Sequence, residues 1–265
     1  MKIGASTSCF YPMLTEKSLD RVIDLGFEVC EIFFNSSCEL EDNFTKEMRK
    51  HADSAGAQIV SVHPFSSFIE NTCIFGEYQR RYDDFIDLYK KQCHAAAVLG
   101  ADIVVIHGAY AVQKRDIPEE LYFDRFAKLI EFGKAEGVRV CQENVVRFRS
   151  QSLDFLKRMR DVFGDDFNMV FDVKQAIRSG YDPFEVAEAM KDSIVHLHLS
   201  DNTPDCDCLP PGKGNFDFKR LFDLMNSADY SGNAVIEIYS KGLEVENELR
   251  SSKEFFDKMD LNVKC

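Results

Sequence analysis

The sequence predicts an α/β fold in which a single (β/α)8 TIM barrel spans residues 1–265 as one domain. Eight β-rich segments alternate with helical segments, and 265 residues over eight strands give about 33 residues for each strand-and-helix unit. No linker, low-complexity tract or block of charge divides the chain. The expected strands are Lys2–Ser6, Val29–Phe34, Gln58–His63, Asp102–His107, Val138–Asn144, Asn168–Asp172, Ile194–Ser200 and Ala234–Tyr239.

The segments between these strands carry helix signals. Within Glu77–Leu99, aromatic and aliphatic residues recur at the spacing of one helix face, which predicts packing against a core. Short polar residues and proline favour helix starts, and glycine favours helix ends. Expected starts are at Thr15, Pro118, Asp182 and Asp217, and expected ends are at Gly26, Gly100 and Gly137. The irregular stretch Asp201–Phe216 is expected to be a substrate loop.

Composition excludes several classes of protein. Asp and Glu number 45 against 32 Lys and Arg, a net charge of −13, so we expect no nucleic-acid partner, which would need a basic surface. No apolar run is long enough for a membrane span. The nine cysteines are scattered and odd in number, which fits reduced thiols in the cytoplasm. The sequence leaves the oligomeric state open and is compatible with a homo-oligomer.

Polar side chains interrupt four successive strands near their carboxyl ends, where a buried strand should be apolar. A buried carboxylate is costly unless it is paired or bound to metal. Each of the four residues follows the previous one by about one strand-and-helix unit, so all four could meet at one rim of the barrel. They are Glu143, Asp172, His198 and Glu237. Three carboxylates and one imidazole suit one divalent ion (Mn²⁺, Mg²⁺, Co²⁺ or Zn²⁺), although separate salt bridges would also explain them.

Short motifs at these strand ends resemble the xylose isomerase-like TIM-barrel superfamily, and within it the sugar phosphate isomerase/epimerase branch. The resemblance covers the whole chain and is specific in the order of its pieces rather than in any one piece. The matching pieces are Gln142-Glu143-Asn144, Phe171-Asp172, His196 to Asp201, Pro211 to Phe218 and Ile236-Glu237.

The resemblance implies a sugar isomerase or epimerase with one divalent metal, held by the four residues named above. The substrate would be a sugar, a sugar phosphate or a related hydroxy-carbonyl compound that reacts through an enediolate. Glu143 and Glu237 would be the catalytic acid–base residues, and His63 and His107 would contact substrate. His196 would lie one layer deeper than His198.

Further candidates come from the residues themselves. Lys213 is a candidate substrate-binding cation, as are Arg147, Arg149 and Arg178, although each could equally be a solvated loop residue. Glu31 is a weaker candidate for the site, because it could instead pair with a cation on a neighbouring strand.

Three alternative functions stay open at this point: a keto-inositol dehydratase, an apurinic endonuclease-like DNA repair enzyme, and a non-catalytic metal- or sugar-binding barrel. The chain has Gln175 where the related endonucleases carry a histidine, and Gly212–Asp217 contains no histidine, which disfavours DNA repair. The arginine that free-ketose epimerases carry shortly after the metal-binding histidine is also missing, which disfavours that activity.

Overall fold

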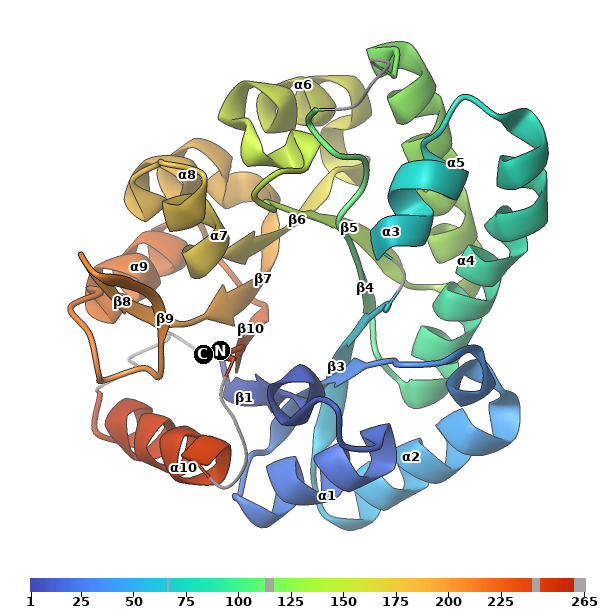
Figure 1. Ribbon diagram of the computed structural model, residues 1–265. Coiled ribbons are helices and arrows are strands. Elements are labelled where there is room, and N and C mark those ends of the chain that lie inside the picture. The colour runs from blue at the N-terminus through green and yellow to red at the C-terminus, as the bar shows by residue number, and fades with distance from the viewer. Residues whose placement is uncertain (66, 113–116, 240–243, 260–265) are drawn as a thin grey trace.

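Eight parallel strands close into a barrel in the order β1-β10-β7-β6-β5-β4-β3-β2, with β1 pairing to both β2 and β10. The structure, a computed structural model, describes residues 1–65, 67–112, 117–239 and 244–259. Figure 1 shows the ring of strands surrounded by helices, so the expected TIM barrel is confirmed. The barrel strands are β1 (Ile3–Ser6), β2 (Val29–Phe33), β3 (Gln58–His63), β4 (Ile103–Ile106), β5 (Arg139–Glu143), β6 (Asn168–Asp172), β7 (Ile194–Leu199) and β10 (Asn233–Ile236).

The strand positions expected from sequence are confirmed, with small differences at the ends. The strands Gln58–His63 and Asn168–Asp172 agree at both ends. The largest difference is at β10, which ends at Ile236 and leaves Glu237 just beyond the strand. Glu237 N still donates to Leu199 O at 3.0 Å, so its backbone stays attached to β7 and its side chain remains at the barrel rim.

Helices form the outer layer. Asp182 and Asp217 cap their helices as expected, each accepting a hydrogen bond from a backbone N–H at 2.9 Å. The helix α1 begins at Thr15, as expected, but the Thr15 side chain does not cap it: its hydroxyl donates to Phe33 O at 3.4 Å and so ties α1 to the end of β2. The helices are α1 (Thr15–Asp24), α2 (Asp42–Ser54), α3 (Ser67–Ile69), α4 (Gln79–Leu99), α5 (Glu119–Glu136), α6 (Leu153–Phe163), α7 (Val173–Arg178), α8 (Pro183–Met190), α9 (Phe218–Ser227) and α10 (Glu244–Asp257).

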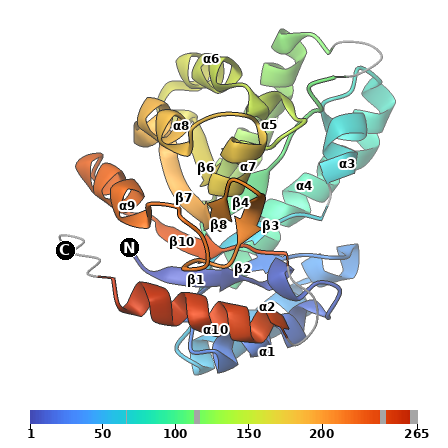
Figure 2. The same cartoon turned by 60° about the vertical axis from the view of Figure 1, so that its left-hand side comes forward.

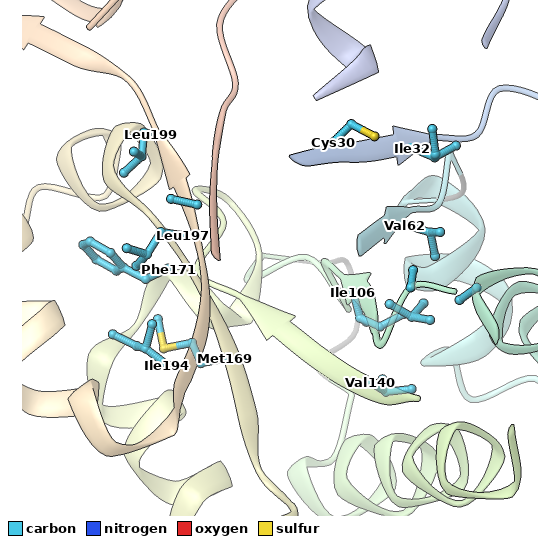
Figure 3. Packing of buried hydrophobic residues seen from close by; sticks show 14 of the residues in the cluster. Cys30, Ile32, Val62, Ile106, Val140, Met169, Phe171, Ile194, Leu197 and Leu199 are labelled. Carbon is cyan, nitrogen blue, oxygen red and sulfur yellow. The ribbon is translucent and has the colours of Figure 1, made fainter. Parts of the chain in front are cut away.

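Side chains on each strand alternate between the barrel interior and the core beneath the helices. Phe171 and Leu197 belong to the large core between strands and helices (Figure 3). Val170, on the other face of β6, belongs to a separate small cluster with residues of β4 and β5. Asp172 lies two residues beyond Val170 and is paired with His198 across β6 and β7, so both side chains face the interior at the carboxyl end.

The segment after β7 is more ordered than the loop expected there. It forms an antiparallel hairpin of β8 (Asp201–Thr203) and β9 (Cys206–Leu209). The Asp201 carboxylate accepts backbone N–H groups of Asn202, Gly212, Gly214 and Phe216 at 2.8–2.9 Å. One buried carboxylate therefore fixes both the start of the hairpin and the glycine-rich turn that follows it.

The last helix completes the outer layer beside the first. Figures 1 and 2 both place α10 next to α1, and Arg21 and Glu246 form an ion pair between them at 3.5 Å. No helix in the described part of the chain combines the length and the apolar character needed to cross a membrane.

Gly4 lies where β1 and β2 approach closely, and a Cβ at this position would be 1.9 Å from Val29 O. We expect Gly4→Ala to lower the free energy of unfolding by about 3 kcal/mol, because backbone atoms would have to move. Gly56→Ala is the control: its Cβ would meet nothing within 4 Å, and its φ of +73° leaves only a conformational cost of about 1 kcal/mol. Urea unfolding measures the loss of unfolding free energy in both variants. Equal losses would contradict the close approach of Gly4 to the Val29 carbonyl.

Candidate functional site

A cavity of about 470 Å³ opens at the carboxyl end of the barrel strands. Its lining combines carboxylates and imidazoles with four aromatic side chains, Tyr11, Phe33, Phe65 and Tyr239. This is the end of the barrel where enzymes of this architecture carry their active sites. The lining residues are Ser8, Tyr11, Phe33, Asn35, His63, Phe65, His107, Glu143, Gln175, Glu237 and Tyr239.

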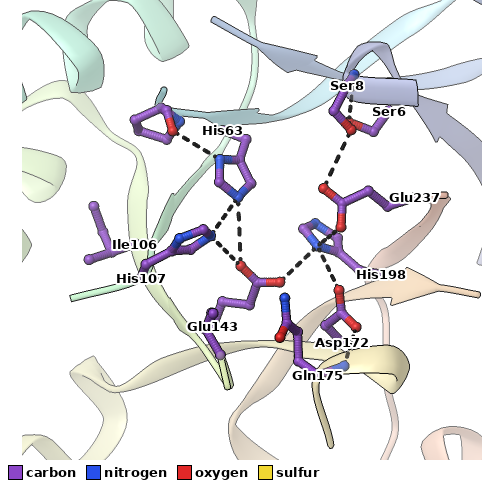
Figure 4. Close-up of polar contacts among 12 residues, drawn as sticks. Ser6, Ser8, His63, Ile106, His107, Glu143, Asp172, Gln175, His198 and Glu237 are labelled. Carbon is purple, nitrogen blue, oxygen red and sulfur yellow. Dashed lines mark hydrogen bonds and ion pairs between the residues drawn. The ribbon is translucent and has the colours of Figure 1, made fainter. Parts of the chain in front are cut away.

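The structure brings together the four side chains that the sequence suggested as metal ligands. One ligand atom from each of Glu143, Asp172, His198 and Glu237 lies within 4.8 Å of the others, and all four residues are buried. His198 Nδ1 faces the three carboxylates, at 3.3 Å from Glu143 Oε1, 3.8 Å from Asp172 Oδ2 and 3.7 Å from Glu237 Oε2 (Figure 4). Three carboxylate oxygens and one imidazole nitrogen around a common point fit a divalent metal ion.

The two neighbours of Glu143 anchor the end of β5 to the strands on either side. Gln142 Nε2 donates to the carbonyls of Ile106 and His107 at 3.0 Å. Asn144 makes two hydrogen bonds with the backbone of Asp172, at 2.8 and 2.9 Å. The Gln-Glu-Asn motif therefore points its carboxylate into the barrel and uses its two amides to hold the ends of β4 and β6.

Asp172 has a second structural role as the N-cap of α7. Its Oδ1 accepts the backbone N–H of Gln175 at 2.9 Å, which directs Oδ2 toward the cluster. Gln175, where the related endonucleases carry histidine, lines the cavity, and its Oε1 accepts the backbone N–H of Val146.

Lys174 is a site residue that the sequence analysis missed. Its side chain is fully buried, and Nζ lies 2.5 Å from Asp172 Oδ2 and 2.6 Å from Glu237 Oε2. A lysine is rarely buried without carboxylate partners, so its position two residues after the Asp172 carboxylate was the available signal. Its ammonium offsets negative charge within the group of three carboxylates.

His63 and His107 lie beside Glu143 on the opposite side from His198. His107 Nε2 is 2.9 Å from Glu143 Oε2 and 3.0 Å from His63 Nε2, while His63 Nδ1 is 3.1 Å from Pro64 O. Ligand atoms of His63, His107 and Glu143 also lie within 4.8 Å of one another. Both rings line the cavity, as the substrate contacts expected from sequence would have to.

Glu31 and His196 lie deeper in the barrel. Both are fully buried, and Glu31 Oε2 is 3.1 Å from Nε2 of His198, on the side of that ring away from the other carboxylates. The titratable groups that face Glu31 are thus imidazoles of β7, and not the neighbouring-strand cation considered from the sequence. His196 Nε2 lies 3.2 Å from Ser61 Oγ, one layer below the cluster.

The candidate cations from the loops lie elsewhere. Lys213 and Arg147 are exposed and are not among the residues that line the cavity. Arg178 forms a two-pronged ion pair with Asp207 of β9, at 2.7 and 2.9 Å, and Arg149 donates to the carbonyl of Ile117. The latter two arginines hold loops in place.

Glu143 and the histidines around it each stabilise the charged form of the other. Burial alone would raise the pKa of Glu143, but hydrogen bonds and charge from His107 and His198 bring it well below its usual value. Burial alone would lower the pKa of His63, yet the hydrogen bond and charge of Glu143 raise it to about 9. The pKa of His198 is raised well above its usual value against the effect of burial, by Glu31 and Glu143. A metal ion that bound to His198 at neutral pH would therefore have to displace a proton from this ring.

The second half of the cluster is balanced by Lys174. Burial and the like charge of Glu143 raise the pKa of Asp172 to about 6, although Lys174 acts in the opposite direction. Burial lowers the pKa of Lys174, but Asp172 and Glu237 raise it well above its usual value. Burial raises the pKa of Glu237, and Lys174 and His198 together lower it below its usual value. The site thus holds an ammonium and an ionised Glu237 at neutral pH.

The raised pKa of His63 predicts how stability depends on pH in metal-free protein. A histidine whose folded-state pKa lies above its unfolded value of about 6.5 contributes stability that is fully present below pH 6.5 and is lost as pH rises through about 9. We expect the free energy of unfolding to fall over this range, with His63 contributing on the order of 3 kcal/mol. Urea unfolding at pH 6, 7.5 and 9.5 should show a shallower fall for His63→Gln, and an unchanged slope would refute the assignment.

Comparisons with known proteins agree with this architecture. The family model described as xylose isomerase-like TIM barrel matches residues 19–259. An uncharacterized protein of Methanocaldococcus jannaschii is 25% identical over 280 residues, which cover 96% of this chain and 93% of the relative.

Two solved structures are similar in fold. The 3-keto-D-glucoside 4-epimerase YcjR from E. coli has a TM-score of 0.81 at 18% identity, covering 98% of this chain and 100% of that one. The structure described as IOLI protein with a binding zinc atom has a TM-score of 0.79 at 15% identity, covering 97% of this chain and 96% of that one. Since the family model spans most of the sequence, this chain belongs to the xylose isomerase-like TIM barrel family.

Proposed function

We propose that this protein is a divalent-metal-dependent isomerase or epimerase of a sugar or a related hydroxy-carbonyl compound. The observation that carries the proposal is the convergence of Glu143, Asp172, His198 and Glu237 within 4.8 Å, with Glu143 and Glu237 lining the cavity. The epimerase activity of one structural neighbour and the zinc atom described for another support it.

The four side chains would hold one ion, and Lys174 would offset part of the remaining negative charge. When bound, a divalent ion would act as a Lewis acid that polarises a carbonyl group of the substrate. This polarisation makes the carbon next to the carbonyl more acidic. The chain's own residues then have to remove a proton from that carbon and return it.

Glu143 and Glu237 are placed to move this proton. Each has one oxygen near His198 Nδ1 and a second oxygen turned elsewhere: Glu143 Oε2 toward His107, and Glu237 Oε1 toward Ser8 at 3.4 Å. Both residues line the cavity, and their lowered pKa values keep them ionised at neutral pH. One would accept the proton and the other, or the same one, would return it. Return to the opposite face gives an epimer, and return to the adjacent carbon gives an isomer.

The cavity wall favours an uncharged sugar over a sugar phosphate. Tyr11, Phe33, Phe65 and Tyr239 offer aromatic faces that suit the C–H faces of a sugar ring, and polar side chains between them can bind hydroxyl groups. Among the residues that the structure describes, the lining contains no lysine or arginine to bind a phosphate. The proposal therefore gives Lys213 no substrate contact.

Dehydration of a keto-inositol would begin with the same proton removal and is the nearest alternative. Screening ketoses, sugar phosphates, keto-inositols and hydroxypyruvate with several divalent metals tests the activity directly. An endonuclease-like enzyme would use His63 and His107 as additional ligands, so elemental analysis should then find more than one ion per chain. A metal-binding barrel without catalysis would bind the ion and turn over none of these compounds.

The ligand assignment predicts unequal effects of two neighbouring histidines. We expect His198→Ala to weaken metal binding much more than His196→Ala, because only His198 Nδ1 faces the three carboxylates. Titration calorimetry with Mn²⁺ on both variants measures the difference. If His196→Ala loses as much affinity for Mn²⁺ as His198→Ala, the assignment of His198 rather than His196 as the metal ligand is wrong.

The acid–base assignment predicts that Glu143→Gln and Glu237→Gln each lower turnover by about 10²–10⁴-fold, because Gln keeps the shape but removes the basic oxygen. Wild-type protein should also exchange the carbon-bound proton of its substrate with deuterated water. Both rates are measured at saturating metal, with bound metal quantified in the same samples. Normal turnover in both metal-loaded variants would require a different mechanism.

A further inference from the structure

Glu31 is a buried carboxylate that the proposed chemistry does not use. It lies on β2 inside the barrel, fully buried, and it does not line the cavity. Burying a charged group costs several kcal/mol unless hydrogen bonds and opposite charge compensate for it. Its partners therefore indicate what it does.

The hydrogen bonds of Glu31 gather on one oxygen. Ser61 Oγ donates to Oε2 at 2.8 Å, and Nε2 of His198 lies 3.1 Å from the same atom. Oε1 has no hydrogen-bond partner among the described residues. Ser61 is the register partner of Glu31 on β3, so the barrel itself places this hydroxyl beside the carboxylate.

The two ring nitrogens of His198 face different groups. Nδ1 faces the three carboxylates of the cluster, and Nε2 faces Glu31. An imidazole that binds a metal through one nitrogen carries its proton on the other and usually donates it to a carboxylate or carbonyl oxygen. With Nδ1 turned toward the cluster, Nε2–H must be the donor and Glu31 Oε2 the acceptor.

The adjoining groups extend this arrangement into a chain of hydrogen bonds. Because the Ser61 proton is directed to Glu31, the Nε2–H of His196 donates to Ser61 Oγ at 3.2 Å. Ligand atoms of Glu31, His196 and His198 also lie close enough to suit a second metal. A second ion would require both Nε2 atoms to lose their protons, whereas the hydrogen-bond chain uses those protons and the Ser61 hydroxyl as they are placed.

We propose that Glu31 is a positioning residue for the metal centre, which holds His198 in the tautomer and ring orientation that present Nδ1 to the metal. This inference rests on the proposed function, because it requires the metal site at Glu143, Asp172, His198 and Glu237. The negative charge of Glu31 also makes the His198 ring a stronger electron donor.

The first test is the metal affinity of Glu31→Gln, measured by titration calorimetry with Mn²⁺. Loss of such a partner typically weakens metal binding by about 10–100-fold, and we expect a loss in this range. Glu39→Gln is the matched control: Glu39 is also buried, but it accepts the backbone N–H of Asn35, and within the described part of the chain it forms no hydrogen bond or ion pair with the four proposed metal ligands. We expect the control to bind Mn²⁺ as the wild type does. A folded Glu31→Gln variant whose affinity for Mn²⁺ lies within threefold of the wild-type affinity would overturn the proposal.

A second measurement remains decisive if Glu31→Gln does not fold. Nitrogen-15 NMR of the zinc-loaded wild type should show His198 protonated at Nε2 and metal-bound at Nδ1, and metal bound at Nε2 would overturn the proposal. A second equivalent of metal in wild type that Glu31→Asp abolishes would also overturn it, since Glu31 would then be a ligand. If the wild-type protein binds no divalent ion, the proposed function itself fails. If the wild-type protein binds the ion and Glu31→Gln binds it equally well, only the role of Glu31 fails.

Discussion

The need to bury several carboxylates close together dominates this structure. Glu143, Asp172 and Glu237 converge with their side chains buried in the protein, where like charges repel more strongly than in water and ions are poorly solvated. The chain places a cationic or donor group against each of them: Lys174 between Asp172 and Glu237, and His107 and His198 on either side of Glu143. The cluster still offers several oxygens and one imidazole nitrogen to a common point, which is what a divalent cation requires.

The barrel supplies the rigidity that this cluster needs. Strand alternation turns Asp172 and His198 inward while Phe171 and Leu197 bury their side chains beneath the helices. Side-chain amides of Gln142 and Asn144 then bind the backbone at the ends of the neighbouring strands. Hydrogen bonds to main-chain groups hold the ends of β4, β5 and β6 together, so the distances between the side chains they carry depend little on flexible loops. Three of the aromatic wall residues, Tyr11, Phe65 and Tyr239, come instead from segments that follow the strands, which is where substrate preference can vary within one family, whereas Phe33 ends β2.

Much of the fold and part of the site could be predicted from sequence because their causes are local. The caps at Asp182 and Asp217 follow from side chains that bind the backbone two or three residues on. The four clustered residues were recognised because polar groups interrupt otherwise apolar strands at regular intervals. Lys174 was missed because lysines are usually exposed, and only the approach of Glu237 from a distant strand accounts for its burial. Lys213 was expected near the substrate, but the structure places it on the exposed turn that Asp201 organises.

The sequence alone determined that strands and helices alternate, that the strands are buried on both faces, and that carboxylates and imidazoles gather at their carboxyl ends. These properties depend on period, composition and neighbours within a few residues. Only the tertiary structure decided which nitrogen of His198 faces the carboxylates, that Glu31 and Ser61 meet across β2 and β3, and that Lys174 joins Asp172 to Glu237. Those contacts join residues far apart in the chain, and their geometry depends on barrel closure and strand register, which no local pattern encodes.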